Sequence, residues 1–317
     1  MSSSALRKAI GTVKDHTSIG LAKVAINTKP DLEIAMVKAT SHEECPPKEK
    51  HVIEIQNLTF NSLEYTQACV FLLSKRIGKT HDWIVAVKTL ILIQRLLING
   101  DPLFHNELLT ARLLNLSDFR DTAHSNSWDH SAFVRAFAVY IDEHLDGSFM
   151  EKSGKVNQPP RRAKSCRDLD FKTRFKDVKT GGIFLKMGSL QRLMDRILAC
   201  RPTGLAKTNR LIMSAVEPIV KESFEVYGDI SEVLTVLRGR ILEMEYKECI
   251  KTLHAYENAA KRIDGLVKFY SWCRETGVGK WFEYPQVQRI TEDKLDALED
   301  FVRSRWNKKD GDHCAAL

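Results

Sequence analysis

The most constraining feature of the sequence is the segment 85–98, whose residues are apolar almost all round a helical turn. Counted from Trp83, the segment also carries Lys88, Gln94 and Arg95, so it is too polar to cross a bilayer. An Asn-Gly-Asp-Pro sequence at 99–102 provides a helix stop signal directly after it. The pattern is that of a central helix buried in an all-α core.

Helical periodicity continues through most of the chain, and alternating β-branched strands are nearly absent. Short breaks separate the helical segments, so neighbouring helices should pack antiparallel and bury one face each, as in an α-solenoid. One helical face is expected to hold Leu58, Ser62, Tyr65, Cys69 and Leu72. Further helices are expected over 103–116, 128–145, 190–198, 205–227, 230–276 and 292–306.

Charge and cysteine usage narrow the class of protein. Lysine and arginine outnumber aspartate and glutamate by 48 to 41, a net charge of +7, which suits a lipid surface, a nucleic acid or an acidic protein. The seven cysteines form no C-x-x-C pair, and residues 1–8 lack the apolar region of a secretory signal. We therefore expect a cytoplasmic protein without disulfides and without structural zinc.

The least regular segment is 147–182, which is rich in Lys and Arg and contains a Gln-Pro-Pro sequence. It is typical of a solvated linker, and an accessory contact with acidic lipids or a partner stays open. Nucleic acid is disfavoured because the aromatic residues nearby form no stacking motif. The expected organisation is an amphipathic membrane helix at 1–18, a helical solenoid at 19–146, the linker, a helical half at 183–306 and a tail at 307–317.

No enzyme motif is complete in this chain. Gly78-Lys79-Thr80 is similar to the end of a P-loop, but Leu73 stands where the motif needs glycine. His42-Glu43 lacks the second histidine of a zinc-binding H-E-x-x-H helix, and there is no G-x-S-x-G nucleophile motif. We therefore predict a binding module without catalytic residues, metal site or cofactor.

The candidate binding site consists of four basic residues near the N-terminus: Lys38, Lys48, Lys50 and His51. The first lies in a short helix that should end near Thr40, and Pro46-Pro47 should open the next helix. The other three then fall in a first helical turn, where free N–H groups and the helix dipole favour anions. Three ammonium groups and an imidazole at this point would suit clustered phosphates.

A second interpretation of the same segment is a charged surface loop in which Glu43, Glu44 and Glu49 neutralise the lysines. Lysine is better placed in the last turn of a helix than in the first, so these positions are unusual for stability alone. The spacing by itself leaves both interpretations open.

The spacing also matches a family signature. Lys38, nine residues, Lys48, one residue and Lys50-His51 fit the pattern K-x9-[KR]-x-[KR]-[HY] of the ANTH domain. Similar segments begin at Trp83, Asn99, Tyr140 and Lys294. Over about residues 5–306 the chain resembles the ANTH-domain clathrin assembly proteins of the CALM and AP180 type, in their plant branch.

The resemblance implies an α-solenoid of stacked antiparallel helices with a C-terminal helical bundle. It also implies binding of phosphatidylinositol 4,5-bisphosphate through the four signature residues, in a peripheral adaptor of clathrin-mediated endocytosis or vesicle budding. The expected locations are clathrin-coated pits of the plasma membrane, coated vesicles or the Golgi. Relatives bind VAMP-type SNAREs through C-terminal helices, so a helical scaffold that binds a SNARE is the alternative function. No SNARE-contact residue can be transferred.

The first residues predict an amphipathic helix. Leu6, Ile10 and Val13 lie on one helical face and charged residues lie off it, so this face could insert among lipid acyl chains. A frayed tail or a helix docked on the core stays open, and Gly11 lowers the intrinsic helicity.

The last residues depart from the family pattern. The sequence has no Asn-Pro-Phe or Asp-Pro-Phe peptide of the kind found in the tails of relatives, which puts clathrin recruitment in doubt. Cys314-Ala315-Ala316-Leu317 fits a C-a-a-X prenylation motif of the geranylgeranyl type. A lipid chain there would add a second membrane signal to the basic site, and a chance match or a truncated or alternatively spliced product is the alternative.

Overall fold

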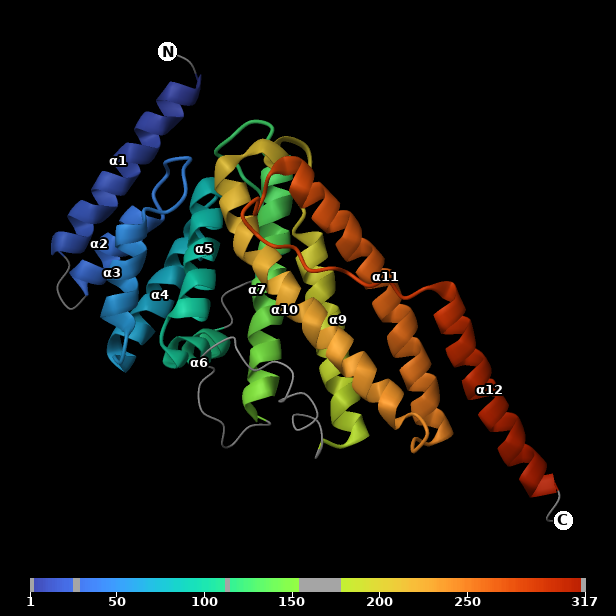
Figure 1. Cartoon of the computed structure of the whole chain (residues 1–317). Helices are drawn as coiled ribbons and strands as arrows, with labels where there is room; N and C mark the ends of the chain where they lie inside the picture. The colour runs from blue at the N-terminus through green and yellow to red at the C-terminus, as the bar shows by residue number, and fades with distance from the viewer. Residues whose placement is uncertain (1–2, 25–28, 112–114, 154–177, 315–317) are drawn as a thin grey trace. The chain divides into compact units, whose positions relative to one another are not determined.

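The structure is a computed structural model and describes residues 3–24, 29–111, 115–153 and 178–314. All regular structure in these ranges is helical (Figure 1), which confirms the predicted all-α class. In chain order the helices are α1 (Ser3–Val24), α2 (Pro30–Ala39), α3 (Glu49–Thr59), α4 (Leu63–Lys79), α5 (Trp83–Asn99), α6 (Pro102–Ala111), α7 (Trp128–Ser153), α9 (Thr180–Ala199), the 3-10 helix η1 (Gly204–Thr208), α10 (Arg210–Arg240), α11 (Tyr246–Thr276) and α12 (Glu292–Cys314). None of the described helices is both long and apolar enough to span a bilayer.

The chain divides into two compact units. Unit 1 comprises Met1–Phe149 and Ala199–Pro218, and unit 2 comprises Met150–Leu198 and Ile219–Leu317. Helix α10 therefore begins in unit 1 and continues into unit 2, with Pro218 inside it. Most of the predicted linker and residues 315–317 lie outside the described residues, so prenylation of Cys314 stays a prediction.

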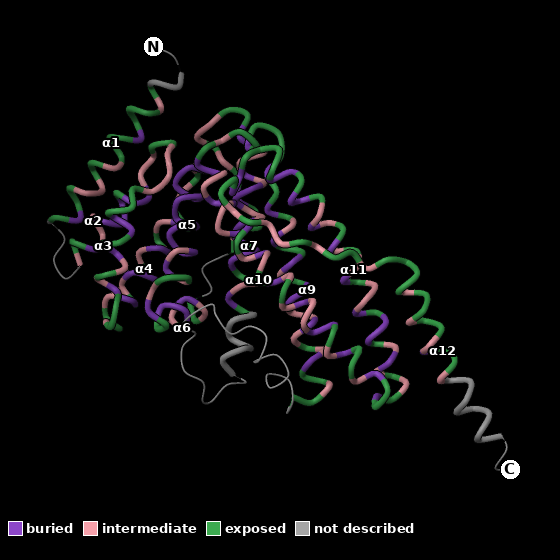
Figure 2. Tube along the Cα trace, viewed as in Figure 1, coloured by how far each residue is buried: buried purple, intermediate pink, exposed green. Residues whose placement is uncertain are grey.

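Helix α5 is the centre of unit 1, as the apolar run 85–98 predicts. Its residues 83–94 are all buried, and α2, α3, α4 and α6 pack against it (Figure 2). Asp82 caps its start by accepting a hydrogen bond from the Ile84 N–H at 2.8 Å. The Gly100 N–H donates to the Leu96 carbonyl at 2.9 Å and closes the last turn. Burial on every side explains why this helix lacks the polar stripe of a surface helix.

The prediction that Leu58 and Leu72 lie on the face of one helix is wrong, because α3 ends at Thr59 and a separate helix, α4, begins at Leu63. Asn61 adopts a left-handed φ of 57°, and its N–H donates to Asp101 Oδ2 at 2.8 Å. Ser62 then caps α4 by accepting from the Tyr65 N–H at 3.3 Å. The periodicity spans two helices whose faces meet the same core, so the pattern alone could not show the break.

The expected helix 230–276 is also wrong, because it is divided between α10 and α11. Gly228 lies inside α10, which continues to Arg240, and α11 begins at Tyr246. A capping box stabilises the start of α11, because the side chains of Glu245 and Glu248 each accept a hydrogen bond from the other residue's backbone N–H. Glycine at 228 was tolerated because neighbouring helical residues outweigh its cost of about 1 kcal/mol.

Unit 2 packs around α11. The buried amide of Gln191 on α9 donates to the Ala255 carbonyl at 3.0 Å, and Arg262 Nε donates to the Gln191 carbonyl at 3.1 Å. In α10, the hydroxyl of Ser223 lies 2.9 Å from the hydroxyl of Tyr270 on α11. These paired polar groups hold the helices in one register, since an unpaired buried polar group would cost stability. Helix α12 packs on α11.

Candidate functional site

The four signature residues lie at the ends of two consecutive helices in unit 1. Lys38 is in the last turn of α2, which ends at Ala39 as expected. Lys48 is the N-cap residue of α3, and Lys50 and His51 are its second and third residues. Pro46 and Pro47 precede the N-cap and do not form the first turn, because α3 begins only at Glu49. The predicted placement of the basic residues at a helix N-terminus is nevertheless observed.

The three lysines of the site are exposed, while His51 is buried. Lys38, Lys48 and Lys50 all face water. His51 is only 8% exposed, and its Nδ1 lies 3.3 Å from Glu54 Oε2. The Lys48 side chain forms no capping bond to the first turn of α3. The ammonium groups can therefore approach a ligand freely, whereas the imidazole is held against the helix.

The neighbouring glutamates decide between the two sequence-based interpretations. Glu44 accepts a hydrogen bond from the Asn209 side chain at 2.6 Å, and Glu49 pairs with Arg95. Glu43 lies 3.6 Å from the Lys48 ammonium, and both side chains are at least half exposed. An ion pair of this kind contributes little in water. Only one of the three glutamates thus pairs with a signature lysine among the described contacts, which favours the ligand-binding interpretation.

The loop 40–48 connects the two helices, and two basic side chains from α5 and α4 bond its backbone. The sequence did not assign these two residues to the site. Lys88 on α5 is 1% exposed, and its ammonium donates to the carbonyl of Ser41 at 3.0 Å and to its hydroxyl at 3.2 Å. Burial lowers the pKa of this ammonium. Arg76 on α4 donates to the Thr40 carbonyl at 2.7 Å. The signal for Lys88 was present in the sequence, since a lysine inside an apolar run is rarely buried without partners.

Helix α1 is docked on the same loop by its polar residues. The Asp15 carboxylate accepts from the His42 backbone N–H at 2.9 Å, and its other oxygen lies 2.8 Å from His42 Nδ1. A Cβ at Gly11 would lie 2.6 Å from His42 Cβ, so only glycine permits this approach. Leu6, Ile10 and Val13 are 55%, 47% and 63% exposed. The helix is therefore docked on the core and still presents its apolar residues to solvent.

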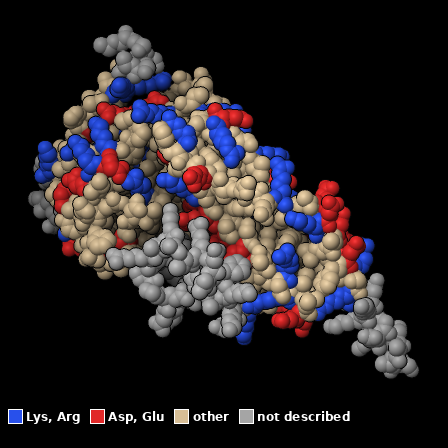
Figure 3. Space-filling view, in the orientation of Figure 1, with Lys and Arg blue, Asp and Glu red and all other residues tan. Residues whose placement is uncertain are grey.

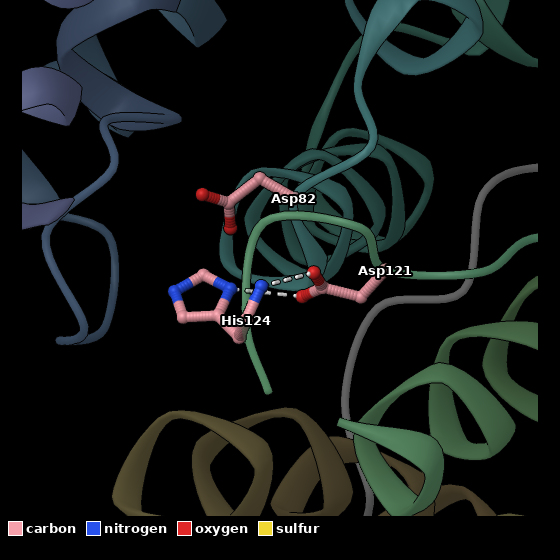
Figure 4. Close-up of side chains that lie close together, drawn as sticks. All are labelled: Asp82, Asp121 and His124. Carbon is pink, nitrogen blue, oxygen red and sulfur yellow. Dashed lines mark hydrogen bonds and ion pairs between the residues drawn. The ribbon is translucent and has the colours of Figure 1, made fainter. Parts of the chain in front are cut away.

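A second cluster, Asp82, Asp121 and His124, offers ligand atoms within 4.8 Å of one another, as a metal site would (Figure 4). The Asp121 carboxylate, however, accepts from the N–H groups of Trp83, Ala123 and His124 and lies 2.9 Å from His124 Nδ1. Its buried oxygens are thus already engaged. Burial alone would raise the pKa of Asp121, but these hydrogen bonds lower it overall. The cluster is built as a cap that joins the segment 121–124 to the start of α5.

Charge on the surface is mixed outside the site. On the face shown in Figure 3, Lys and Arg side chains alternate with Asp and Glu side chains, and they form no unbroken basic area. Residues 154–177, which the structure does not describe, hold eight Lys and Arg residues against three Asp residues, so most of the net charge of +7 lies there. An anion site in the described part of the chain would therefore depend on local geometry. The end of α2 and the start of α3, joined by the anchored loop, supply such a geometry.

The family model of the ANTH domain matches residues 31–304, a range that contains all four signature residues. The chain belongs to the ANTH domain family. This domain is an adaptor without catalytic activity, in agreement with the prediction of a binding module. Helix α1 precedes the matched range, and Cys314 follows it.

Relatives with this domain occur in Arabidopsis thaliana. A probable clathrin assembly protein is 47% identical over 95% of this chain and 55% of its own length. A putative clathrin assembly protein is 45% identical over 95% of this chain and 57% of its own length. The clathrin coat assembly protein AP180 is 37% identical over 95% of this chain and 50% of its own length. The chain thus spans about half the length of these curated relatives.

Solved structures with similar helices share little sequence with this ANTH chain. The endocytic adaptor complex AENTH gives a TM-score of 0.46 at 20% identity, over 77% of this chain and 95% of that one. Helical ANTH and ENTH tubules on PI(4,5)P2-containing membranes give a TM-score of 0.44 at 17% identity, over 86% of this chain and 99% of that one.

Proposed function

We propose that this protein is a peripheral membrane adaptor that binds phosphoinositide headgroups and acts in clathrin-mediated endocytosis or vesicle budding. The ANTH domain and the clathrin assembly names of its relatives support the process. Plasma-membrane coated pits, coated vesicles or the Golgi are the membranes that the family resemblance implies. Recruitment of clathrin itself would need segments outside the matched domain.

The observation that carries the proposal is the exposure of three lysines where α2 ends and α3 begins. The N-terminus of α3 carries free backbone N–H groups and a partial positive charge, both of which favour an anion. Lys48 and Lys50 add their ammonium groups at this turn, and Lys38 adds one from α2. Phosphatidylinositol 4,5-bisphosphate offers clustered phosphates at a membrane surface, which such a group of donors fits.

The buried residues beneath the site support the same function. Lys88 and Arg76 bond the carbonyls of Ser41 and Thr40, which fixes the start of the loop that leads from Lys38 to Lys48. A preorganised site loses less entropy when the ligand binds. His51 is fixed by Glu54, and we propose that it supports the first turn of α3 and offers at most one ring edge to the headgroup.

The test is sedimentation with vesicles of phosphatidylcholine, with and without phosphatidylinositol 4,5-bisphosphate. The variant K48E/K50E should lose binding. The control K261E/K268E removes the same charge from exposed positions on α11 and should keep it. Equal loss in both variants would show that binding follows net charge, and unchanged binding by K48E/K50E would refute the assigned site.

A second candidate function is binding of an amphipathic helix from a VAMP-type SNARE. It is supported by exposed apolar side chains in unit 2, since Leu185 on α9 is 65% exposed and Leu242 after α10 is 69% exposed. Amphipathic helices dock on such apolar surfaces. Capture of a synthetic VAMP-type helix without lipid, lost on L185S or L242S, would support this function, and retention of the helix by both variants would contradict it.

A further inference from the structure

Two large apolar side chains of unit 1, at the start of α7 and in η1, are exposed to solvent. Trp128, the first residue of α7, is 70% exposed, and Leu205 in η1 is 61% exposed. Both are far more exposed than Trp83 in the same unit, which is 3% exposed. We call this pair the Trp128 edge. A single exposed apolar side chain is common on protein surfaces, but exposed apolar side chains that gather in one place can mark an interaction surface.

The backbone of the Trp128 edge is held in place by hydrogen bonds. Asp129 Oδ2 accepts from the Leu205 N–H at 3.0 Å, and Asp129 Oδ1 accepts from the Thr203 hydroxyl at 3.3 Å. Gly204 has a φ of +49°, and a Cβ there would lie 2.0 Å from the Asp129 carboxylate. The residue that follows Trp128 is thus bonded directly to the backbone of Leu205, which ties the start of α7 to η1.

A hydrogen bond links the segment after η1 to the loop that precedes Lys48. Asn209 directly follows η1, and its side chain donates to Glu44 Oε1 at 2.6 Å. Glu44 belongs to the loop 40–48, which leads directly into Lys48. The loop that carries Leu205 is therefore bonded to the loop that presents the lysines, and all of these residues belong to unit 1.

The chemistry of the edge fits the interfacial region of a bilayer. Tryptophan combines a large apolar ring with one N–H donor, and it is enriched where acyl chains meet headgroups. Arg120 lies with its guanidinium 5.9 Å from the centre of the Trp128 ring, and exposed Lys207 follows Leu205 in η1. Cations beside exposed apolar side chains suit an anionic membrane surface better than an apolar protein groove.

We propose that Trp128 and Leu205 form a second membrane contact, which enters the lipid interface when the lysines bind a headgroup. This inference rests on the proposed phosphoinositide function. It assigns to the protein one surface with two components: charged groups that recognise the headgroup, and a rigid apolar edge that adds affinity for the bilayer. A soluble headgroup would engage only the first component.

The test compares W128A/L205S with W281A/L63S, a control that also removes one exposed tryptophan and one exposed leucine. The ligands are vesicles of phosphatidylserine with phosphatidylinositol 4,5-bisphosphate, and soluble inositol 1,4,5-trisphosphate. We expect W128A/L205S to bind the vesicles about fivefold more weakly, because apolar area is no longer removed from water, and to bind the soluble headgroup unchanged. The control should bind both as the unaltered protein does.

Fluorescence gives an independent measurement of the same contact. Lipids brominated near the headgroup should quench the unaltered protein, and W128F should lose that quenching while W281F keeps it. Equal vesicle affinity of the two double variants, or quenching that survives W128F, would overturn the inference while leaving the lysine site intact. Absence of vesicle binding by the unaltered protein would overturn both the proposed function and this edge.

Discussion

Asp15 and His42 join helix α1 to the loop that leads to Lys48. The His42 backbone N–H donates to Asp15 Oδ2 at 2.9 Å, and His42 Nδ1 lies 2.8 Å from Asp15 Oδ1. Arg76 approaches the same carboxylate at 3.4 Å. Burial would raise the pKa of Asp15, but the hydrogen bonds from His42 and the charge of Arg76 lower it overall. Helix α1 and the loop that leads to Lys48 are therefore parts of one bonded structure.

Loss of the Asp15–His42 contact should detach α1 while the core stays folded. Because the pKa of Asp15 is lower in the folded state, its contribution is present above the ordinary value of 3.8 and is lost as pH falls through the folded value. We expect D15N to raise hydrogen exchange in α1 at neutral pH and to lower the free energy of unfolding by about 1–3 kcal/mol. Acidification below pH 3.8 should reproduce the release of α1 in the unaltered protein, and equal exchange in D15N would contradict the role of this contact.

Gly11 and Gly20 provide a matched pair of substitution sites within helix α1. A Cβ at Gly11 would clash with His42, whereas a Cβ at Gly20 would meet nothing within 4 Å. G11A should therefore weaken the docking of α1 despite the better helix propensity of alanine. G20A should stabilise the helix by up to about 1 kcal/mol. Thermal unfolding and hydrogen exchange of α1 should shift in opposite directions, and a gain in stability for G11A would show that the close approach is unimportant.

Lys88 is expected to act as a positioning residue for the site. K88M removes the buried ammonium that bonds Ser41 and leaves the Ser41 carbonyl without this partner. The loss should cost about 1–3 kcal/mol in chemical denaturation. It should also weaken vesicle binding, because the loop leading to Lys48 loses its anchor. The exposed residue Lys79 provides the control, since K79M should leave both measurements unchanged.

Titration of His124 should make the free energy of unfolding depend on pH near neutrality. The hydrogen bond with Asp121 raises the pKa of His124 above its ordinary value of 6.5, despite the opposing effect of burial. A raised folded pKa means that the stabilisation is fully present below pH 6.5 and is lost as pH rises through the folded value. The unfolding free energy should therefore fall over that window, and the fall should disappear in H124N. Persistence of the same pH dependence in H124N would assign it to another group.

Local signals predicted the central helix and the helix ends that carry the lysines. The apolar run 85–98 has no polar face to expose, so it had to be buried whatever surrounds it. The helix end at Ala39 follows from the local pattern and places Lys38 as predicted. The start of α3 was predicted at Pro46-Pro47 but lies at Glu49, so Lys48 is the N-cap residue and not part of the first turn. The break near Asn61 was missed although Asn61 and Ser62 are residue types that favour a left-handed turn and an N-cap, because the helical periodicity continues across them.

The sequence by itself determined that this protein is helical and that basic side chains stand at two consecutive helix ends, because periodicity and capping act over a few residues. Only the tertiary structure decided which of those side chains meet water. His51 and Lys88 are buried, and Lys48 and Lys50 are exposed, although all four are basic. That division depends on residues distant in the chain that pack above and below each position, and the free energy of burial is set by those neighbours.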